Sequence, residues 1–137
     1  MDNRDARLEE EHPLLLELNP TIVRSSEWFL VPDDERARRH GWSPEPFPVA
    51  FHAQPGHPGQ APYGIYIASN ATVGGVTPNP FQAVAKNTPP FPGSWGVLSW
   101  TPQSAWVAHE EVHKSSNLVN FYLGFDARYR AGVSGDA

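Results

Sequence analysis

Apolar residues recur at spacings of three and four along residues 117–130, which is the pattern of an amphipathic helix. At 3.6 residues per turn these positions fall on one face, which can pack against the rest of the domain. They are Leu118, Phe121, Tyr122, Phe125 and Tyr129. Gly132 follows as a suitable stop. The pattern therefore predicts a C-terminal amphipathic helix that packs on a sheet.

The first thirty residues predict a helix followed by strands. Residues 5–16 contain good helix formers, and Leu8 and Leu15 fall about one face apart, although Pro13 predicts a shortened helix. Residues 21–31 are enriched in β-branched and aromatic residues and predict one or two strands. The N-terminal region therefore predicts a short helix and the beginning of a sheet.

The middle of the chain alternates between strand patterns and turn-rich stretches. Residues 48–54 and 63–68 predict two further strands. Residues 33–40 fit either a helical turn or a charged hairpin loop, and residues 71–94 predict a long ordered loop rich in glycine and proline. A short apolar run follows at 95–100. Together the patterns predict an α+β domain, an antiparallel four-stranded meander with an N-terminal helix and a C-terminal amphipathic helix.

Composition limits the kinds of protein that this chain can be. It has 137 residues, 39% of them hydrophobic, and a formal net charge of −5. These values predict one globular domain over 1–137, with flexible tails at 1–6 and 133–137. No basic stripe with interleaved aromatic residues is present, so nucleic acid is not an expected partner. The charged start and the lack of a run of about 18 apolar residues predict a cytoplasmic protein that does not enter membranes.

The sequence contains no cysteine. Disulfides, thiolate metal sites and thiol nucleophiles are therefore excluded, and packing alone must hold the fold. Between Gly41 and Ala108 only Glu45 and Lys86 are charged, and twelve of the fifteen prolines fall there. This proline density is incompatible with helix, and the segment is too apolar for a disordered linker. Strands and rigid loops are therefore expected in the middle of the chain.

Three local motifs follow one another along the chain. They are His57, Pro58, Pro62 and Tyr63, then Gly96, Val97, Leu98 and Ser99, and finally Trp106. In this order they resemble three features of the ubiquitin-conjugating (UBC) fold: a proline-aromatic turn between two strands, the segment around the catalytic cysteine, and a tryptophan that precedes the later helices. Over residues 8–132 the chain resembles the UBC-like superfamily, and most closely its prokaryotic branch, whose genes lie beside ubiquitin-like, adenylating and JAB-peptidase genes. The resemblance implies a UBC-like fold and two partners, a ubiquitin-like protein and its adenylating enzyme.

The chain departs from the family where the chemistry takes place. On this resemblance Val97 stands at the position of the catalytic cysteine, and Phe91, Pro92 and Gly93 replace the histidine-proline-asparagine motif. A valine side chain offers no nucleophile, and Ser99 would be a weak one without an adjacent base. Thioester transfer is therefore in doubt. Either the fold serves as a binding module or another residue has taken over the chemistry.

A separate motif points to a different chemistry. His109, Glu110 and His113 spell H-E-x-x-H, which on a helix places two imidazoles one turn apart for a zinc ion and a glutamate beside the metal-bound water. Against this, the charged Glu111 takes a position that faces a packed core in zinc peptidases, and the downstream candidate for a third ligand is Asp126. The alternatives are therefore a small zinc-dependent hydrolase or a solvated segment without metal.

Aromatic residues near the cysteine-aligned segment are candidates for partner binding. They are Phe81, Phe91, Trp95, Trp100 and Trp106. The two phenylalanines either fold back onto the domain or meet a partner, and the tryptophans fit core packing as well as ligand stacking. Ser99 is a candidate nucleophile that any histidine could serve as base, although no G-x-S-x-G elbow surrounds it, and His109 is a further catalytic candidate. A protein-interaction module with no chemistry and no cofactor is therefore a third hypothesis.

Overall fold

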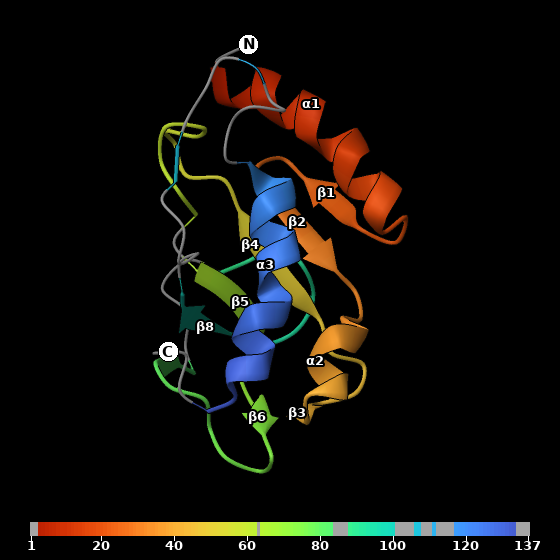
Figure 1. Cartoon of the computed structure of the whole chain (residues 1–137), viewed down its shortest axis with the longest axis vertical. Helices are drawn as coiled ribbons and strands as arrows, with labels where there is room; N and C mark the ends of the chain where they lie inside the picture. The colour runs from red at the N-terminus through yellow and green to blue at the C-terminus, as the bar shows by residue number, and fades with distance from the viewer. Residues whose placement is uncertain are drawn as a thin grey trace.

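A computed structural model describes residues 3–62, 64–83, 88–100, 106–107, 111 and 117–133. Helices and short strands alternate along this part of the chain (Figure 1). In chain order they are α1 (Asn3–Leu18), β1 (Val23–Ser25), β2 (Trp28–Val31), α2 (Glu35–Arg39), β3 (Trp42–Ser43), β4 (Val49–His52), β5 (Gly64–Ala68), β6 (Thr72–Val73), β7 (Phe81–Gln82), β8 (Trp95–Ser99) and α3 (Leu118–Ala131). The fold is a mixed α+β structure, the class that the sequence predicts.

Within the described residues, six strands form one antiparallel sheet in the order β1-β2-β4-β5-β8-β7. The first four follow one another as a meander, with Phe29 opposite Phe51 and Ala50 opposite Tyr66. β8 and β7 continue the sheet beyond the four strands that the sequence predicts. β3 and β6 form a separate two-stranded sheet. The meander therefore forms one part of a wider sheet.

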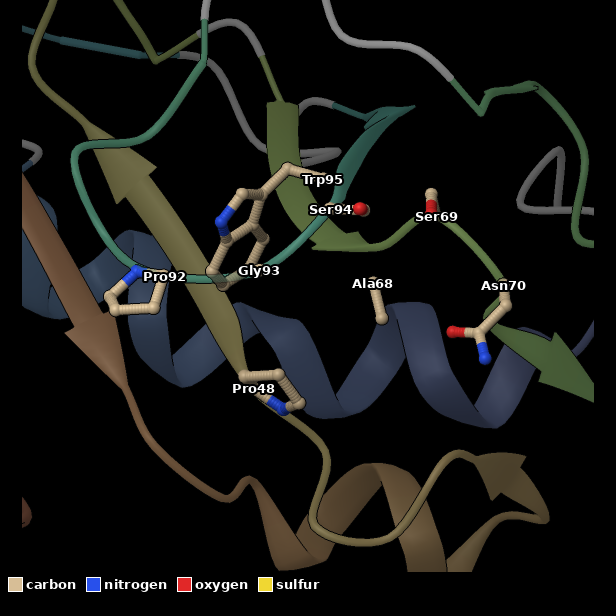
Figure 2. Close-up of a pocket in the computed structure, with 8 residues that line it drawn as sticks. All are labelled: Pro48, Ala68, Ser69, Asn70, Pro92, Gly93, Ser94 and Trp95. Carbon is tan, nitrogen blue, oxygen red and sulfur yellow. The ribbon is translucent and has the colours of Figure 1, made fainter.

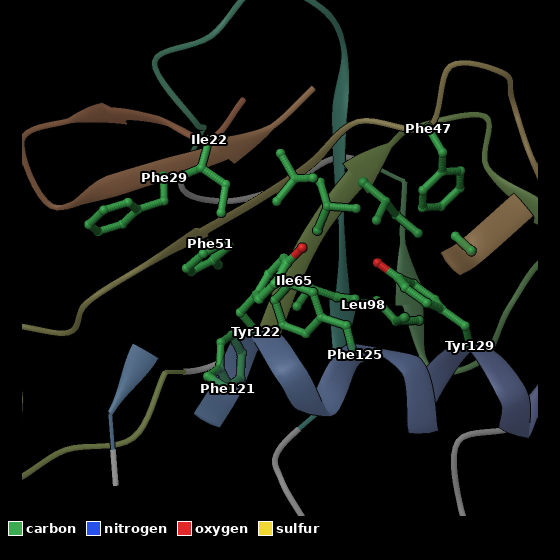
Figure 3. Close-up of a cluster of buried hydrophobic side chains, with 14 of the residues drawn as sticks. Ile22, Phe29, Phe47, Phe51, Ile65, Leu98, Phe121, Tyr122, Phe125 and Tyr129 are labelled. Atoms are coloured by element: carbon green, nitrogen blue, oxygen red, sulfur yellow. The ribbon is translucent and has the colours of Figure 1, made fainter. Parts of the chain in front are cut away.

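Alternating side chains divide the strands of the sheet between two hydrophobic clusters. Phe51, Ile65 and Leu98 belong to the larger cluster, and Figure 3 shows Phe125 and Tyr129 of α3 pointing toward this side of the sheet. Side chains that point the other way form a second cluster, which we call the aromatic face. It consists of Trp28, Ala50, Tyr66, Trp95 and Val97. The sheet is therefore buried on both sides, as its nearly continuous apolar strands require.

α1 continues past Pro13 to Leu18, whereas the sequence predicts that this proline shortens the helix. Leu8 and Leu15 lie on either side of the proline, and both are fully buried in the larger cluster. Their packing offsets the backbone hydrogen bond that a proline cannot donate. Tertiary contacts therefore override the local preference in this helix.

α3 begins and ends at recognisable caps. The Asn117 side chain accepts a hydrogen bond from the N–H of Asn120, whose side chain accepts one from the N–H of Asn117. This reciprocal capping box satisfies two donors that a helix start leaves free. Gly132 caps the other end, which confirms the predicted stop. All five apolar positions predicted to share one face are buried.

Three segments are more regular than their sequence indicates. Residues 33–40 contain α2, so the helical alternative is correct and the hairpin loop is not. Residues 71–94 contain β6 and β7, where the sequence predicts loop alone. The apolar run at 95–100 contains β8, which pairs with β5 and β7. These strands are short and their partners are distant in sequence, so a local pattern does not reveal them.

Candidate functional site

Val97, which the family resemblance aligns with a catalytic cysteine, lies in the middle of β8. It pairs with Tyr66 of β5 and with Gln82 of β7, so a strand flanks it on each side. Its side chain is 3% exposed and belongs to the aromatic face. Ser99 ends the same strand, opposite Gly64, and is partly buried. A side chain at position 97 therefore meets an incoming protein only after the residues that cover it have moved.

Gly96, the residue before the cysteine-aligned position, permits close packing of β7. A Cβ atom at Gly96 would lie 2.5 Å from the ring of Phe81 and 2.7 Å from the carbonyl oxygen of Gln82. Only glycine therefore lets β7 and the Phe81 ring lie directly against β8. This glycine, part of the motif that carries the resemblance, has a packing role here.

A groove of about 340 Å³ opens beside the N-terminal end of β8 (Figure 2). The described residues that line it are Pro48, Ala68, Ser69, Asn70, Pro92, Gly93, Ser94 and Trp95. Figure 2 shows the rings of Pro92 and Trp95 toward one end and Ser69 and Asn70 toward the other. No described lining residue carries a charge. Trp95 lies two positions before Val97 and on the same face of the sheet, so the groove adjoins the cysteine-aligned position.

Backbone contacts hold the loop wall of this groove. The indole N–H of Trp95 donates to the carbonyl of Phe91 at 3.0 Å, and the N–H of Ser69 donates to the carbonyl of Ser94 at 3.0 Å. Between them Gly93 has a φ of 121°, a conformation that side chains other than glycine strongly disfavour. The turn that leads into β8 is therefore fixed by one glycine and two hydrogen bonds.

Trp28, His52 and Tyr66 form an aromatic group on the same side of the sheet. His52 stacks on Trp28 with ring centroids 4.2 Å apart, and its Nε2 lies 3.5 Å from the hydroxyl of Tyr66. Burial lowers the pKa of His52, and the nearby Glu27 carboxylate opposes this effect only in part. The imidazole is therefore neutral near pH 7 and forms part of a packed aromatic surface.

The five aromatic residues predicted to bind a partner all bury most of their surface. They are Phe81, Phe91, Trp95, Trp100 and Trp106. Phe81 and Trp100 pack against the larger cluster, and Phe91 packs against the aromatic face. Trp106 donates its indole N–H to the carbonyl of Pro58 at 2.7 Å. These contacts give each residue a structural role, and direct contact with a partner stays a prediction.

A buried pair of polar residues joins three segments that sequence analysis leaves unconnected. Glu11 of α1 and His57 have no exposed side-chain surface, and their Oε2 and Nε2 atoms are 2.8 Å apart. The other oxygen of Glu11 accepts a hydrogen bond from the N–H of Leu118, in the first turn of α3. Glu11 lies three residues after Leu8 and four before Leu15, so helical spacing could have placed it on the buried face.

A more polar cleft of about 510 Å³ lies where the end of α1, α2 and α3 meet. Asp34 accepts hydrogen bonds from the guanidinium of Arg36 and from the hydroxyl of Tyr129, at 2.9 Å each. Arg36 also lies 4.2 Å above the ring of Tyr122. Burial, reinforced by the Asp34 charge, raises the pKa of Tyr129 well above its usual value. Because these charges satisfy one another, the cluster fixes α2 against α3.

The three residues of the H-E-x-x-H motif, His109, Glu110 and His113, lie outside the described residues. Asp126, the downstream candidate for a third ligand, accepts from Arg130 at 2.6 Å and lies 3.3 Å from Nε2 of His40. Across the ranges that the structure describes, no three potential metal-ligating side chains come together. The zinc-dependent hydrolase therefore stays a hypothesis without support from this part of the chain.

The comparisons with known proteins do not assign a family. No protein-family model, curated protein or solved structure matches the chain. In the described part, no helix has both the length and the apolar character needed to cross a membrane.

Proposed function

We propose that the chain is a UBC-like component of a bacterial ubiquitin-like modification or defence-associated pathway. In this proposal it is a cytoplasmic protein that binds a ubiquitin-like protein, or its adenylating enzyme, without carrying the partner as a thioester. An antiparallel meander with a helix before it and a helix after it supports the proposal at the level of architecture. The additional strands β7 and β8 distinguish this chain from the four-stranded arrangement that the resemblance implies.

The groove beside β8 is the observation that carries the proposal. Its volume of about 340 Å³ is at the lower end of the range for ligand sites, roughly 300–1,000 Å³. Small side chains such as Ala68 and Ser94 leave room for backbone, while Pro48 and Trp95 offer flat apolar surfaces. A neutral lining favours an uncharged segment, because a charged one would lose hydration without gaining a partner. The thin glycine backbone of a ubiquitin-like protein's tail has these properties, provided that its terminal carboxylate stays in solvent at the open side of the groove.

The same region supports binding without covalent transfer. The chain has no thiol, and the residue at the cysteine-aligned position, Val97, is 3% exposed. Covalent catalysis requires an activated nucleophile that the substrate can reach. A site that binds the tail while position 97 stays covered fits a module that recruits or presents a ubiquitin-like protein.

The groove can be tested with a short synthetic peptide that ends in Gly-Gly. Titrated into ¹⁵N-labelled protein, the peptide is expected to shift the amide signals of Ser69, Asn70 and Ser94 and the indole signal of Trp95. Asn70→Trp places a large ring at the exposed rim of the groove and should weaken binding at least tenfold. Thr77→Trp, an exposed position outside the groove, is the matched control and should bind like wild type.

Two outcomes would refute the proposal. One is the absence of any shift with both the peptide and an intact ubiquitin-like protein encoded beside the gene. The other is a set of shifts that map to α1 or α3 and persist unchanged in Asn70→Trp.

A further inference from the structure

Residues 88–94, here called the strap, lie across the side of the sheet opposite α3. Figure 2 views this side directly, with the strap passing in front of β4 and α3 behind the sheet. The strap reads Thr-Pro-Pro-Phe-Pro-Gly-Ser and carries no charged residue. Its Pro89 is buried and its Phe91 packs against the aromatic face. A proline-rich segment therefore covers a surface built largely from aromatic side chains.

The strap contacts the aromatic face through a ring and a carbonyl, as a bound peptide could. Phe91 packs against this face, to which Trp95 belongs and in which Trp28 and Tyr66 meet edge to face with centroids 5.0 Å apart. The indole N–H of Trp95 donates to the carbonyl of Phe91 at 3.0 Å. Aromatic grooves recognise proline-rich segments through contacts of this kind, because prolines restrict the backbone before binding and the carbonyls stay free to accept.

Few hydrogen bonds tie the strap to the sheet. Pro89, Pro90 and Pro92 have no N–H to donate, so the strap cannot continue the hydrogen-bond ladder of the strands. Among the described residues, the strap's hydrogen bonds are the one from Trp95 and the one from the Ser69 N–H to the Ser94 carbonyl. Apolar contact provides the remaining attachment. Displacement of the strap would leave the sheet ladder intact and remove Phe91 from the aromatic face, to which Val97 belongs.

We propose that the aromatic face is a binding surface for proline-rich peptide segments of partner proteins, and that the strap is its intramolecular competitor. The committed ligand is an uncharged segment in which an aromatic residue follows two prolines, since the chain's own segment of this kind occupies the surface. The inference goes beyond the proposed function and does not depend on it. It needs no ubiquitin-like protein. The tail groove adjoins this face and shares Pro92, Gly93 and Ser94 with the strap and Trp95 with the aromatic face, so the ligand class, and not the location, separates the two proposals.

The strap competes at high local concentration. A segment that runs directly into β8 has an effective concentration on the order of millimolar at this face. A peptide of similar intrinsic affinity displaces the strap only at a concentration above this effective concentration, so wild type should bind the peptide weakly. Weakening the strap should therefore raise the apparent affinity for the same peptide, because the binding-competent open state becomes more populated.

A synthetic peptide of residues 88–94 tests this directly. It is titrated into wild type and into Phe91→Ala, with the Trp95 indole signal and tryptophan fluorescence as readouts. We expect Phe91→Ala to bind the peptide at least tenfold more tightly than wild type. A control peptide with alanine in place of its phenylalanine should not bind, and Leu123→Ala, an exposed site on α3, should leave peptide affinity unchanged.

Pro90→Gly provides a second variant. Because Pro90 is exposed, glycine removes no buried contact of the docked strap, but it raises the conformational entropy of the displaced strap and so favours displacement. It should also bind the peptide more tightly than wild type, by a smaller factor. Equal affinities in wild type and in every folded strap variant, or no binding to any of them at millimolar peptide, would overturn the inference. The Gly-Gly peptide is titrated separately, so a failure of one proposal is distinguishable from a failure of the other.

Discussion

Tyr66 and Val97 lie directly opposite each other on β5 and β8, and each is 3% exposed on the aromatic face. The position that the resemblance aligns with a catalytic cysteine is therefore buried among the residues of the aromatic face. The missing cysteine and the covered position agree with each other, since neither favours attack on a partner. Binding at the neighbouring groove requires neither a thiol nor access to position 97.

Val97→Cys should yield a folded protein whose thiol reacts slowly. The thiol would be the chain's only one, so labelling with an aromatic disulfide reagent reports position 97 alone. Because access requires local opening, labelling in native buffer should be at least about tenfold slower than for Thr77→Cys, an exposed control. Equal labelling rates in the two variants would contradict a covered position.

Glu11→Ala should destabilise the fold by about 3–5 kcal/mol, the usual cost of removing one partner of a buried pair. It leaves the His57 ring and the N–H of Leu118 without their acceptor. Glu11→Gln keeps the shape and one acceptor and should cost less, about 1–3 kcal/mol. Urea unfolding followed by tryptophan fluorescence measures both.

The neighbouring Glu10 supplies the control for this pair, because its side chain is 52% exposed. Glu10→Ala should leave the urea midpoint close to that of wild type. A similar loss of stability at positions 10 and 11 would show that helix α1, rather than the buried pair, is the sensitive element.

His52 should make the fold less stable as the pH falls below neutrality. Its pKa is lowered in the folded state by burial, so the unfolded chain binds the proton more readily. The contribution of His52 to folding stability is complete above its pKa in the unfolded chain, about 6.5. It is lost as the pH falls toward the lower pKa of the folded state. His52→Phe keeps a ring on Trp28 and removes the titrating group. Free energies of unfolding measured from pH 7.5 down to 5 should therefore fall more steeply for wild type, and parallel curves would refute this role.

Tyr129→Phe should remove the hydrogen bond to Asp34 and cost about 1 kcal/mol at neutral pH. Burial raises the pKa of Tyr129 in the folded state. Its contribution to folding stability is therefore present below its pKa in the unfolded chain, about 10, and is lost at higher pH. Wild type should therefore lose stability above pH 10 more steeply than the variant.

Tyr122→Phe, which loses only a 3.4 Å contact with Asn19, should have the smaller effect at neutral pH. The opposite order would contradict the assignment of Asp34 as the central acceptor.

Elements with a strong local pattern could be predicted from the sequence. α3 is one, because its apolar positions repeat with helical spacing and Gly132 ends it. β2, β4 and β5 are others, since their apolar and β-branched residues stand between turn signals. Pro13 misled the prediction for α1, because propensity does not include the burial of Leu8 and Leu15.

Features that depend on distant partners could not be predicted. β3 and β7 have two residues each and exist through pairing with β6 and β8. The groove brings together Pro48, Ala68 and Pro92, which no local pattern connects. Glu11 is an intermediate case: helical spacing places it on the buried face, but its partner His57 is 46 residues away.

Native and denaturing mass spectrometry of one reaction mixture tests the proposed function most directly. The mixture contains the chain, a ubiquitin-like protein encoded beside its gene, the adenylating enzyme and ATP, without reducing agent. We predict a one-to-one complex of the chain with the ubiquitin-like protein under native conditions, and an unchanged mass of the chain after denaturation. A covalent adduct that survives denaturation, or no complex under native conditions, would contradict a module that binds without carrying its partner.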